Sequence, residues 1–105
     1  MLKHIVLFAF KDDADPAEIE AIFQRFAWLR TVMPEIRSFS WGKFNGTPVM
    51  PRHGYNHGFE MEFESEAERQ RYLENDDHLS LAPRIYALLK DSENSLLAFG
   101  YEAST

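Results

Sequence analysis

The chain has 105 residues, which is enough for one domain with a single hydrophobic core. Hydrophobic residues make up 45% of the sequence and cysteine is absent, so the composition is globular and excludes disulfides, iron–sulfur clusters and thiolate zinc sites. The net charge is −6 and the basic residues are scattered, which argues against a nucleic-acid partner because phosphate backbones need clustered Lys and Arg.

No segment is expected to enter a membrane. Residues 1–8 are apolar like the start of a signal peptide, but the run is too short, and charged residues follow without a small-residue cleavage site. No stretch approaches the roughly 20 apolar residues that a spanning helix needs. We therefore expect a cytoplasmic protein with no membrane partner.

The N-terminal half predicts a strand, a helix and a second strand. Residues 4–10 are apolar on both faces, which is typical of a central strand covered on both sides. Asp15 can cap a helix and Pro16 fits its first position, and apolar residues then recur at helical spacing as far as Pro34. Residues 36–44 predict the second strand.

The C-terminal half predicts two strands around two helical segments. A loop at 45–54 leads into a strand at 56–64, where apolar and polar residues alternate. A capping box opens a short helix at 65–74. A break follows, then a helix at 78–90 and a last strand at 95–101.

The order strand, helix, strand, strand, helix, strand is typical of the split βαβ, ferredoxin-like α+β fold, with residues 1–105 as a single domain. This fold has helices on one face of a four-stranded antiparallel sheet. Ile5 and Leu7 on the other face favour cover by a partner, whereas Glu60 and Glu62 indicate that part of it is solvated. Since exposed apolar stripes are uncommon, we expect a homodimer packed sheet to sheet.

Two histidines lie on the apolar faces of strands that this fold places side by side. We expect His4 and His57 to point into one cavity beneath the helices, where partial desolvation keeps them poised near neutral pH. Hydrogen-bonded core histidines are the alternative. A metal site is a further one, but the histidines lack the close spacing of dedicated ligands, so no metal is predicted.

Tyr72 and His78 form a second candidate pair. They would lie on different faces of one continuous helix, but the break at 75–77 lets both turn inward. Tyr can stabilise a developing oxyanion and His can accept a proton. Alternatively, Tyr72 packs as an amphipathic aromatic and His78 caps a helix. No phosphate-binding, dinucleotide-binding or nucleophile-elbow motif occurs, so no cofactor is predicted.

Four segments together resemble the stress-responsive α/β-barrel (Dabb) family in order and spacing. They are KHIVLFAFK at 3–11, PEIRSFSWG at 34–42, GYNHGF at 54–59 and FES at 63–65. The resemblance implies a ferredoxin-like subunit in a dimeric α+β barrel. Most members of the family have no assigned activity and some plant members are stress-related. One enzyme of this fold closes a linear polyketide by intramolecular aldol condensation without a metal or organic cofactor.

The resemblance also implies roles for individual residues. His4 and His57 match the strand histidines of that enzyme, Tyr72 its acid/base tyrosine and His78 its catalytic histidine. Phe26 stands where the enzyme has a pocket tyrosine. The common His-Pro-Ala-His stretch of the family reads Asn-Asp-Asp-His here, so only its last histidine is kept.

Two functions follow as hypotheses. The first is a cofactor-independent cyclase, isomerase or lyase on a small carbonyl or aromatic compound. In it, His78 takes a proton with Tyr72 as partner, and His4 and His57 orient the substrate. Its apolar walls would be Phe8, Phe23, Phe26, Phe59 and Phe63. The second is a non-catalytic binder of a small apolar ligand, or a stress-associated homodimer whose phenylalanines fill the pocket.

Overall fold

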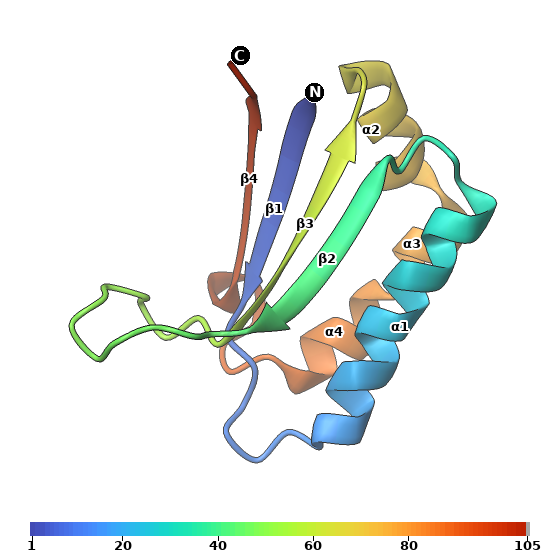
Figure 1. Cartoon of the computed structure of the whole chain (residues 1–105). Coiled ribbons are helices and arrows are strands. Elements are labelled where there is room, and N and C mark those ends of the chain that lie inside the picture. The colour runs from blue at the N-terminus through green and yellow to red at the C-terminus, as the bar shows by residue number, and fades with distance from the viewer. Residues whose placement is uncertain (105) are drawn as a thin grey trace.

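The computed structural model describes residues 1–104 and confirms the predicted ferredoxin-like α+β architecture. The four strands pair antiparallel in the order β2-β3-β1-β4, and the α-helices lie against one face of this sheet (Figure 1). The elements are β1 (Leu2–Phe8), α1 (Pro16–Val32), β2 (Ser38–Lys43), β3 (His57–Phe63), α2 (Glu66–Glu74), α3 (Asp76–Leu79), α4 (Ala82–Leu88), the 3₁₀ turn η1 (Ser92–Ser95) and β4 (Leu96–Glu102).

The predicted helix at 78–90 is wrong, because the chain forms two shorter helices there. The Asn75 side chain accepts hydrogen bonds from the backbone N–H groups of Asp77 (2.8 Å) and His78 (3.2 Å), so α3 begins directly after α2. Pro83 lies in the first turn of α4. It has no N–H to continue a helix from Leu79, so the chain starts afresh.

The first strand also differs from its prediction. It covers Leu2–Phe8 instead of 4–10, and Phe10 forms an isolated bridge with Leu89. Only one of its faces is fully covered, because Leu2, His4, Val6 and Phe8 are buried while the residues between them are partly exposed. The two-sided burial expected for this strand is therefore absent within one subunit.

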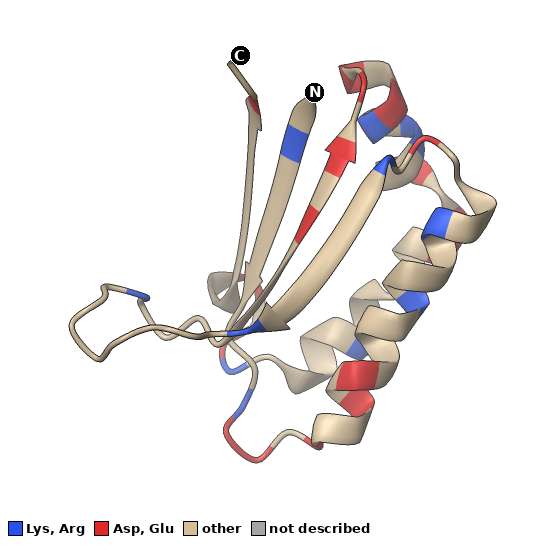
Figure 2. Cartoon of the chain, in the orientation of Figure 1, with Lys and Arg blue, Asp and Glu red and all other residues tan. Residues whose placement is uncertain are grey.

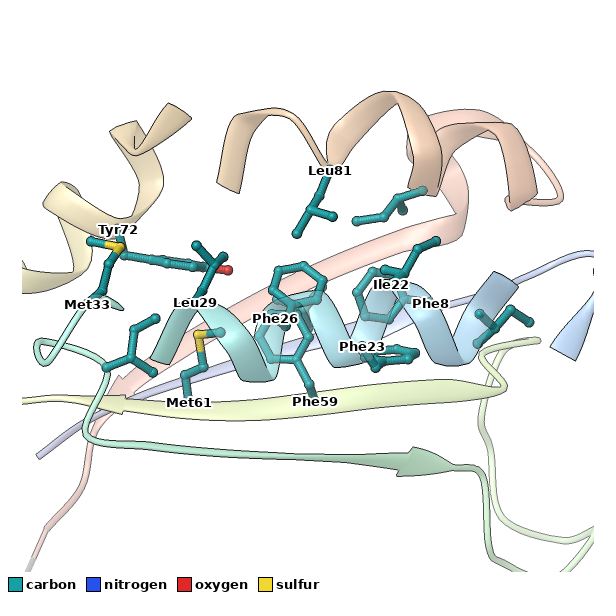
Figure 3. Packing of buried hydrophobic residues seen from close by; sticks show 14 of the residues in the cluster. Phe8, Ile22, Phe23, Phe26, Leu29, Met33, Phe59, Met61, Tyr72 and Leu81 are labelled. Carbon is teal, nitrogen blue, oxygen red and sulfur yellow. The ribbon is translucent and has the colours of Figure 1, made fainter. Parts of the chain in front are cut away.

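The core lies between α1 and the covered face of the sheet. The predicted apolar stripe of α1 is buried, and alternate residues of β1 and β3 meet it (Figure 3). Aromatic rings fill much of this layer. Phe8 stacks on Phe10 at 5.3 Å between ring centroids, and Phe26 lies 4.9 Å from Phe59. A ligand can enter this layer only where the rings leave a gap.

The opposite face of the sheet carries exposed apolar side chains next to an ion-pair cluster. In the register of β1 and β4, Phe99 lies beside Ile5 and Leu97 beside Leu7, and both β4 residues are more than 40% exposed. At one end of the same face, Lys3 lies 3.0 Å from carboxylate oxygens of both Glu60 and Glu62. This face is apolar near β4 and charged near β3.

Charged residues are spread over the helices, the loops and the ends of the strands, with both signs intermingled (Figure 2). Within residues 1–104, no helix has the length and apolar character required to cross a membrane.

Candidate functional site

A cavity of about 230 Å³ opens between the sheet and the three C-terminal helices. Its walls are largely apolar and come from β1, β3, β4 and all four α-helices. Three polar side chains selected from the sequence converge on it: His4, Tyr72 and His78. An apolar cavity with a few convergent polar groups is the usual form of a small-molecule site.

His78 is held in one tautomer by the end of α2. Its Nδ1 lies 3.2 Å from the backbone oxygen of Leu73. A carbonyl oxygen can only accept, so the neutral ring carries its proton on Nδ1 and keeps the lone pair on Nε2. Burial lowers the pKa of His78, and the bond to Leu73 opposes this only in part. His78 is therefore a neutral imidazole at pH 7 with a free basic nitrogen.

Tyr72 lies against His78 in the last turn of α2. Their ring centroids are 4.3 Å apart, so the break after α2 brings the two side chains together as predicted. Tyr72 is only 1% exposed, and its hydroxyl makes no hydrogen bond within residues 1–104. Burial raises the pKa of Tyr72 far above its usual range. The hydroxyl thus stays protonated and has a hydrogen bond to donate.

His4 adds a third polar group from β1. Its ring lies 6.0 Å from that of Tyr72, and its Nδ1 is a buried nitrogen that lacks a hydrogen-bond partner in residues 1–104. Burial lowers the pKa of His4 to about 4, helped by the nearby charge of Arg69. His4 is therefore neutral at pH 7, and an unpartnered buried nitrogen requires a reason.

His57 lies outside this cavity, so the expectation that it shares one pocket with His4 is wrong. His57 pairs with Phe8 across the sheet, whereas His4 pairs with Met61. The two histidines share a face, but they are separated by four residues along the strands, or about 13 Å. The ring of His57 packs against Phe10 at 5.2 Å, and its Nδ1 lies 2.8 Å from Asn56 Oδ1.

Of the five phenylalanines predicted to form the apolar walls of the site, some line the cavity and others lie outside it. Phe8, Phe26 and Phe59 line the cavity. Phe23 instead stacks on Trp41 at 4.4 Å, and Phe63 packs behind Tyr72 at 5.5 Å without reaching the cavity. These last two side chains belong to the core around the site.

Sequence reasoning missed a tyrosine beside the cavity. Tyr86 of α4 lines it together with Ala82, one helical turn earlier, and is 41% exposed. Ala82 and Tyr86 are four residues apart in the sequence, which is helical spacing. Because the helix was predicted to begin at residue 78, this spacing gave no reason to select Tyr86 as a site residue. Tyr86 therefore adds a second tyrosine to the wall of the cavity.

The histidines of the cavity are not joined by enough further ligands to hold a metal ion within residues 1–104. Within the described part of the chain, no three His, Asp or Glu side chains are grouped as ligands for a metal ion. The arrangement consists of a basic imidazole nitrogen, a protonated phenol and a second neutral imidazole in apolar surroundings. Such groups can remove a proton from carbon and stabilise the oxygen anion that results.

Comparison with known proteins finds that the chain is similar to plant proteins. It is 32% identical to the stress-response A/B barrel domain-containing protein HS1 of Arabidopsis thaliana over 81 residues, covering 77% of this chain and 73% of HS1. It is 31% identical to olivetolic acid cyclase of Cannabis sativa over 78 residues, covering 74% and 76% of the two chains.

Solved structures share the whole fold. The At3g17210 protein of Arabidopsis thaliana has a TM-score of 0.84 at 28% identity, with coverage of 100% of this chain and 97% of that one. A dimeric ferredoxin-like protein of unknown function from Jannaschia has a TM-score of 0.86 at 19% identity, covering 97% and 98%. Hydroxynitrile lyase from Passiflora edulis has a TM-score of 0.81 at 22% identity, covering 95% and 90%.

A match to a protein-family model agrees with the similar sequences and the similar structures. The model of the stress responsive A/B barrel domain, Dabb, matches residues 2–99, which is nearly the whole chain. The chain is therefore a member of the stress-responsive A/B barrel (Dabb) family.

Proposed function

We propose that the cavity is a cofactor-independent acid/base site for a small carbonyl or aromatic compound. The observation that carries this proposal is the pairing of His78 and Tyr72. One ring is fixed with its basic nitrogen free, and the other lies 4.3 Å away with an unpartnered hydroxyl. His78 is the base and Tyr72 is the hydrogen-bond donor.

The proposed reaction begins at a carbon next to a carbonyl group. Nε2 of His78 takes the proton, and the electron pair of the broken C–H bond moves into an enolate whose oxygen accepts a hydrogen bond from Tyr72. The imidazolium of His78 then returns its proton. With a β,γ-unsaturated substrate the enolate is conjugated, and return of the proton to its γ-carbon gives isomerisation. Attack of the enolate carbon on a second carbonyl gives cyclisation instead, with the proton going to the new alkoxide.

His4 serves as a second contact for the substrate oxygen. A hydrogen bond between a polar group in the cavity and the ring of His4 would offset the cost of burying this side chain. Because the pKa of His4 is lowered to about 4, it acts as a neutral ring and adds no positive charge.

The size of the cavity limits the substrate. Its 230 Å³ lies below the range of roughly 300–1,000 Å³ that is usual for pockets of drug-sized ligands. A compound of one ring fits, and a long acyl chain does not. Similarity to olivetolic acid cyclase supports ring-closing chemistry, and Phe26 adds an apolar ring without a hydroxyl to the wall of this cavity.

The alternative is a binder without turnover. The apolar lining and the three convergent polar side chains favour it equally, since a bound ligand needs no proton transfer. The relative HS1 is named for stress response and for no reaction, which is also consistent with binding. Binding and catalysis differ in whether His78 removes a proton.

We also infer that two subunits pack through the open face of the sheet. Similar structures are described as dimeric, and Phe99 and Leu97 would otherwise stay exposed on that face. Light scattering should give twice the mass of 12.3 kDa, and Phe99→Glu should yield monomers. A wild-type monomer at micromolar concentration would contradict this inference.

Deuterium exchange tests the acid/base proposal without knowledge of the natural substrate. A panel of one-ring ketones and 1,3-dicarbonyl compounds is incubated with the protein in D₂O, and loss of the α-proton is followed by NMR. Exchange above the buffer rate that disappears in His78→Asn supports catalysis. His53→Asn is the matched control, since His53 lies on an exposed loop outside the cavity. Ligand binding without exchange would favour the binder.

A further inference from the structure

A second cavity, of about 460 Å³, lies beyond the ring stack that closes the first one. Phe8 lines the first cavity and stacks at 5.3 Å on Phe10, which lines the second. The loop after β1 and the loop between β2 and β3 leave the same end of the sheet and border this second cavity (Figure 1). It uses neither Tyr72 nor His78.

Positive side chains predominate around the second cavity, although the chain as a whole has a charge of −6. Lys11, Lys43 and Arg52 line it, and none of them forms an ion pair within residues 1–104. The carboxylates that line it are Asp12, which lies 3.3 Å from Lys90 outside the cavity, and Glu20. The cations therefore lack an anionic partner of their own.

The backbone that carries these groups is firmly held. The Lys11 N–H donates to the Leu88 oxygen at 2.8 Å, and the Phe44 N–H donates to the Asn56 oxygen at 2.8 Å. Arg52 lies over the ring of Phe44, 4.5 Å from its centroid. The backbone beside Lys11 and Lys43 and the contact of Arg52 with Phe44 thus place the three cations around one cavity.

His57 presents a ring nitrogen to the same cavity. The side chain of Asn56 bonds both backbone groups of Phe10, with its oxygen 3.1 Å from the N–H and its nitrogen 2.8 Å from the carbonyl, which fixes the orientation of the amide. His57 Nδ1 lies 2.8 Å from that oxygen and must donate to it. Nε2 of His57 is left without a partner in residues 1–104, beside the cations.

We propose that the second cavity binds a small aromatic carboxylate. The carboxylate lies among Lys11, Lys43 and Arg52, where charge-assisted hydrogen bonds are strong, and the ring lies against Trp41 and Phe44. The proposal goes beyond the acid/base function and would stand if that function failed, since the two cavities share no polar side chain.

Titration of ¹⁵N-labelled protein tests this proposal, with benzoate as the probe and benzyl alcohol as its uncharged counterpart. Benzoate should shift the Trp41 indole and the amides of Lys11 and Lys43 in a saturable way, and benzyl alcohol should not. Lys43→Gln and Arg52→Gln should each weaken benzoate binding about tenfold. Arg84→Gln is the control, because it removes the same charge from α4 away from this cavity.

Other results would overturn the proposal. No saturable shift with benzoate, or equal weakening by Arg84→Gln and Lys43→Gln, would show that the cations are only a solvated surface. Inorganic phosphate binding as well as benzoate would contradict recognition of the ring. Should Lys43→Gln fail to fold, Arg52→Gln provides the same test from an exposed loop.

Discussion

His4 and His57 occupy the same face of neighbouring strands, yet their surroundings differ in every respect that matters for chemistry. His4 is 7% exposed, lies beside Tyr72 and has a nitrogen without a partner. His57 is partly exposed and is held at Nδ1 by Asn56. One ring faces the cavity of the proposed acid/base site, and the other faces a cavity lined by cations.

The difference shows what strand alternation can and cannot tell. Alternation assigns a residue to a face of the sheet, and both histidines were assigned correctly. Position along the strand decides which cavity a side chain reaches, and four residues of antiparallel strand separate the two histidines by about 13 Å. Two polar groups on one face are a single site only when the register brings them opposite each other.

The largest effect should come from His78. His78→Asn removes the free basic nitrogen and should lower proton exchange about 10²–10⁴-fold, whereas His57→Asn should change it less than about tenfold. The measurement is α-proton exchange on whichever ketone the wild type accepts. Equal losses of exchange rate in His78→Asn and His57→Asn would contradict the assignment of the acid/base chemistry to the cavity of His78.

Tyr72→Phe should lower the exchange rate by about 10²-fold, since it removes one donor to the developing oxyanion. Its melting temperature should change little, because the hydroxyl makes no hydrogen bond in the described structure. Steady-state kinetics separate the two quantities: kcat should fall and KM should stay nearly constant. A rise in KM alone would indicate that Tyr72 only binds.

Stability should depend on pH through His4. Its pKa is about 4 in the folded protein and 6.5 when unperturbed, so between these values the unfolded state binds more protons. Stability due to the neutral ring is complete above pH 6.5 and is lost as the pH falls towards 4. At about 1.4 kcal/mol per pH unit this amounts to at most about 3 kcal/mol. Urea unfolding at several pH values gives the free energy of unfolding as a function of pH. Between pH 4 and 6.5 this free energy should change less with pH in His4→Leu than in the wild type, and an equal pH dependence would contradict the burial of His4.

The smallest effects should have opposite signs at neutral pH. His4→Leu removes an unpartnered buried nitrogen and should leave the free energy of unfolding equal or raise it by about 1 kcal/mol. His57→Leu removes the hydrogen bond to Asn56 and should lower it by about 1 kcal/mol. Chemical denaturation at pH 7.5 measures the free energy of unfolding of both variants. Destabilisation of the same size in His4→Leu and His57→Leu would contradict the difference described between the two histidines.

Much of the fold was accessible from the sequence because it rests on local signals. Asp15 and Pro16 mark the start of α1, and alternating residues mark β3. The division of the last helix was missed because it depends on Asn75 capping α3 and on Pro83 forcing a restart. The contact between Tyr72 and His78 was predicted, since the break between them was visible. The cavity that His57 lines was not predicted correctly, since it depends on the register between β1 and β3.

The tautomer of His78 tests the central claim most directly. Long-range ¹H–¹⁵N spectra at pH 7 report the protonation of each imidazole nitrogen in all four histidines. We expect His78 to be neutral with its proton on Nδ1, and we expect acetophenone to shift His78 and His4 while leaving His57 unchanged. A His78 that is cationic at pH 7, or that carries its proton on Nε2, would have no free basic nitrogen for the cavity and would contradict the account.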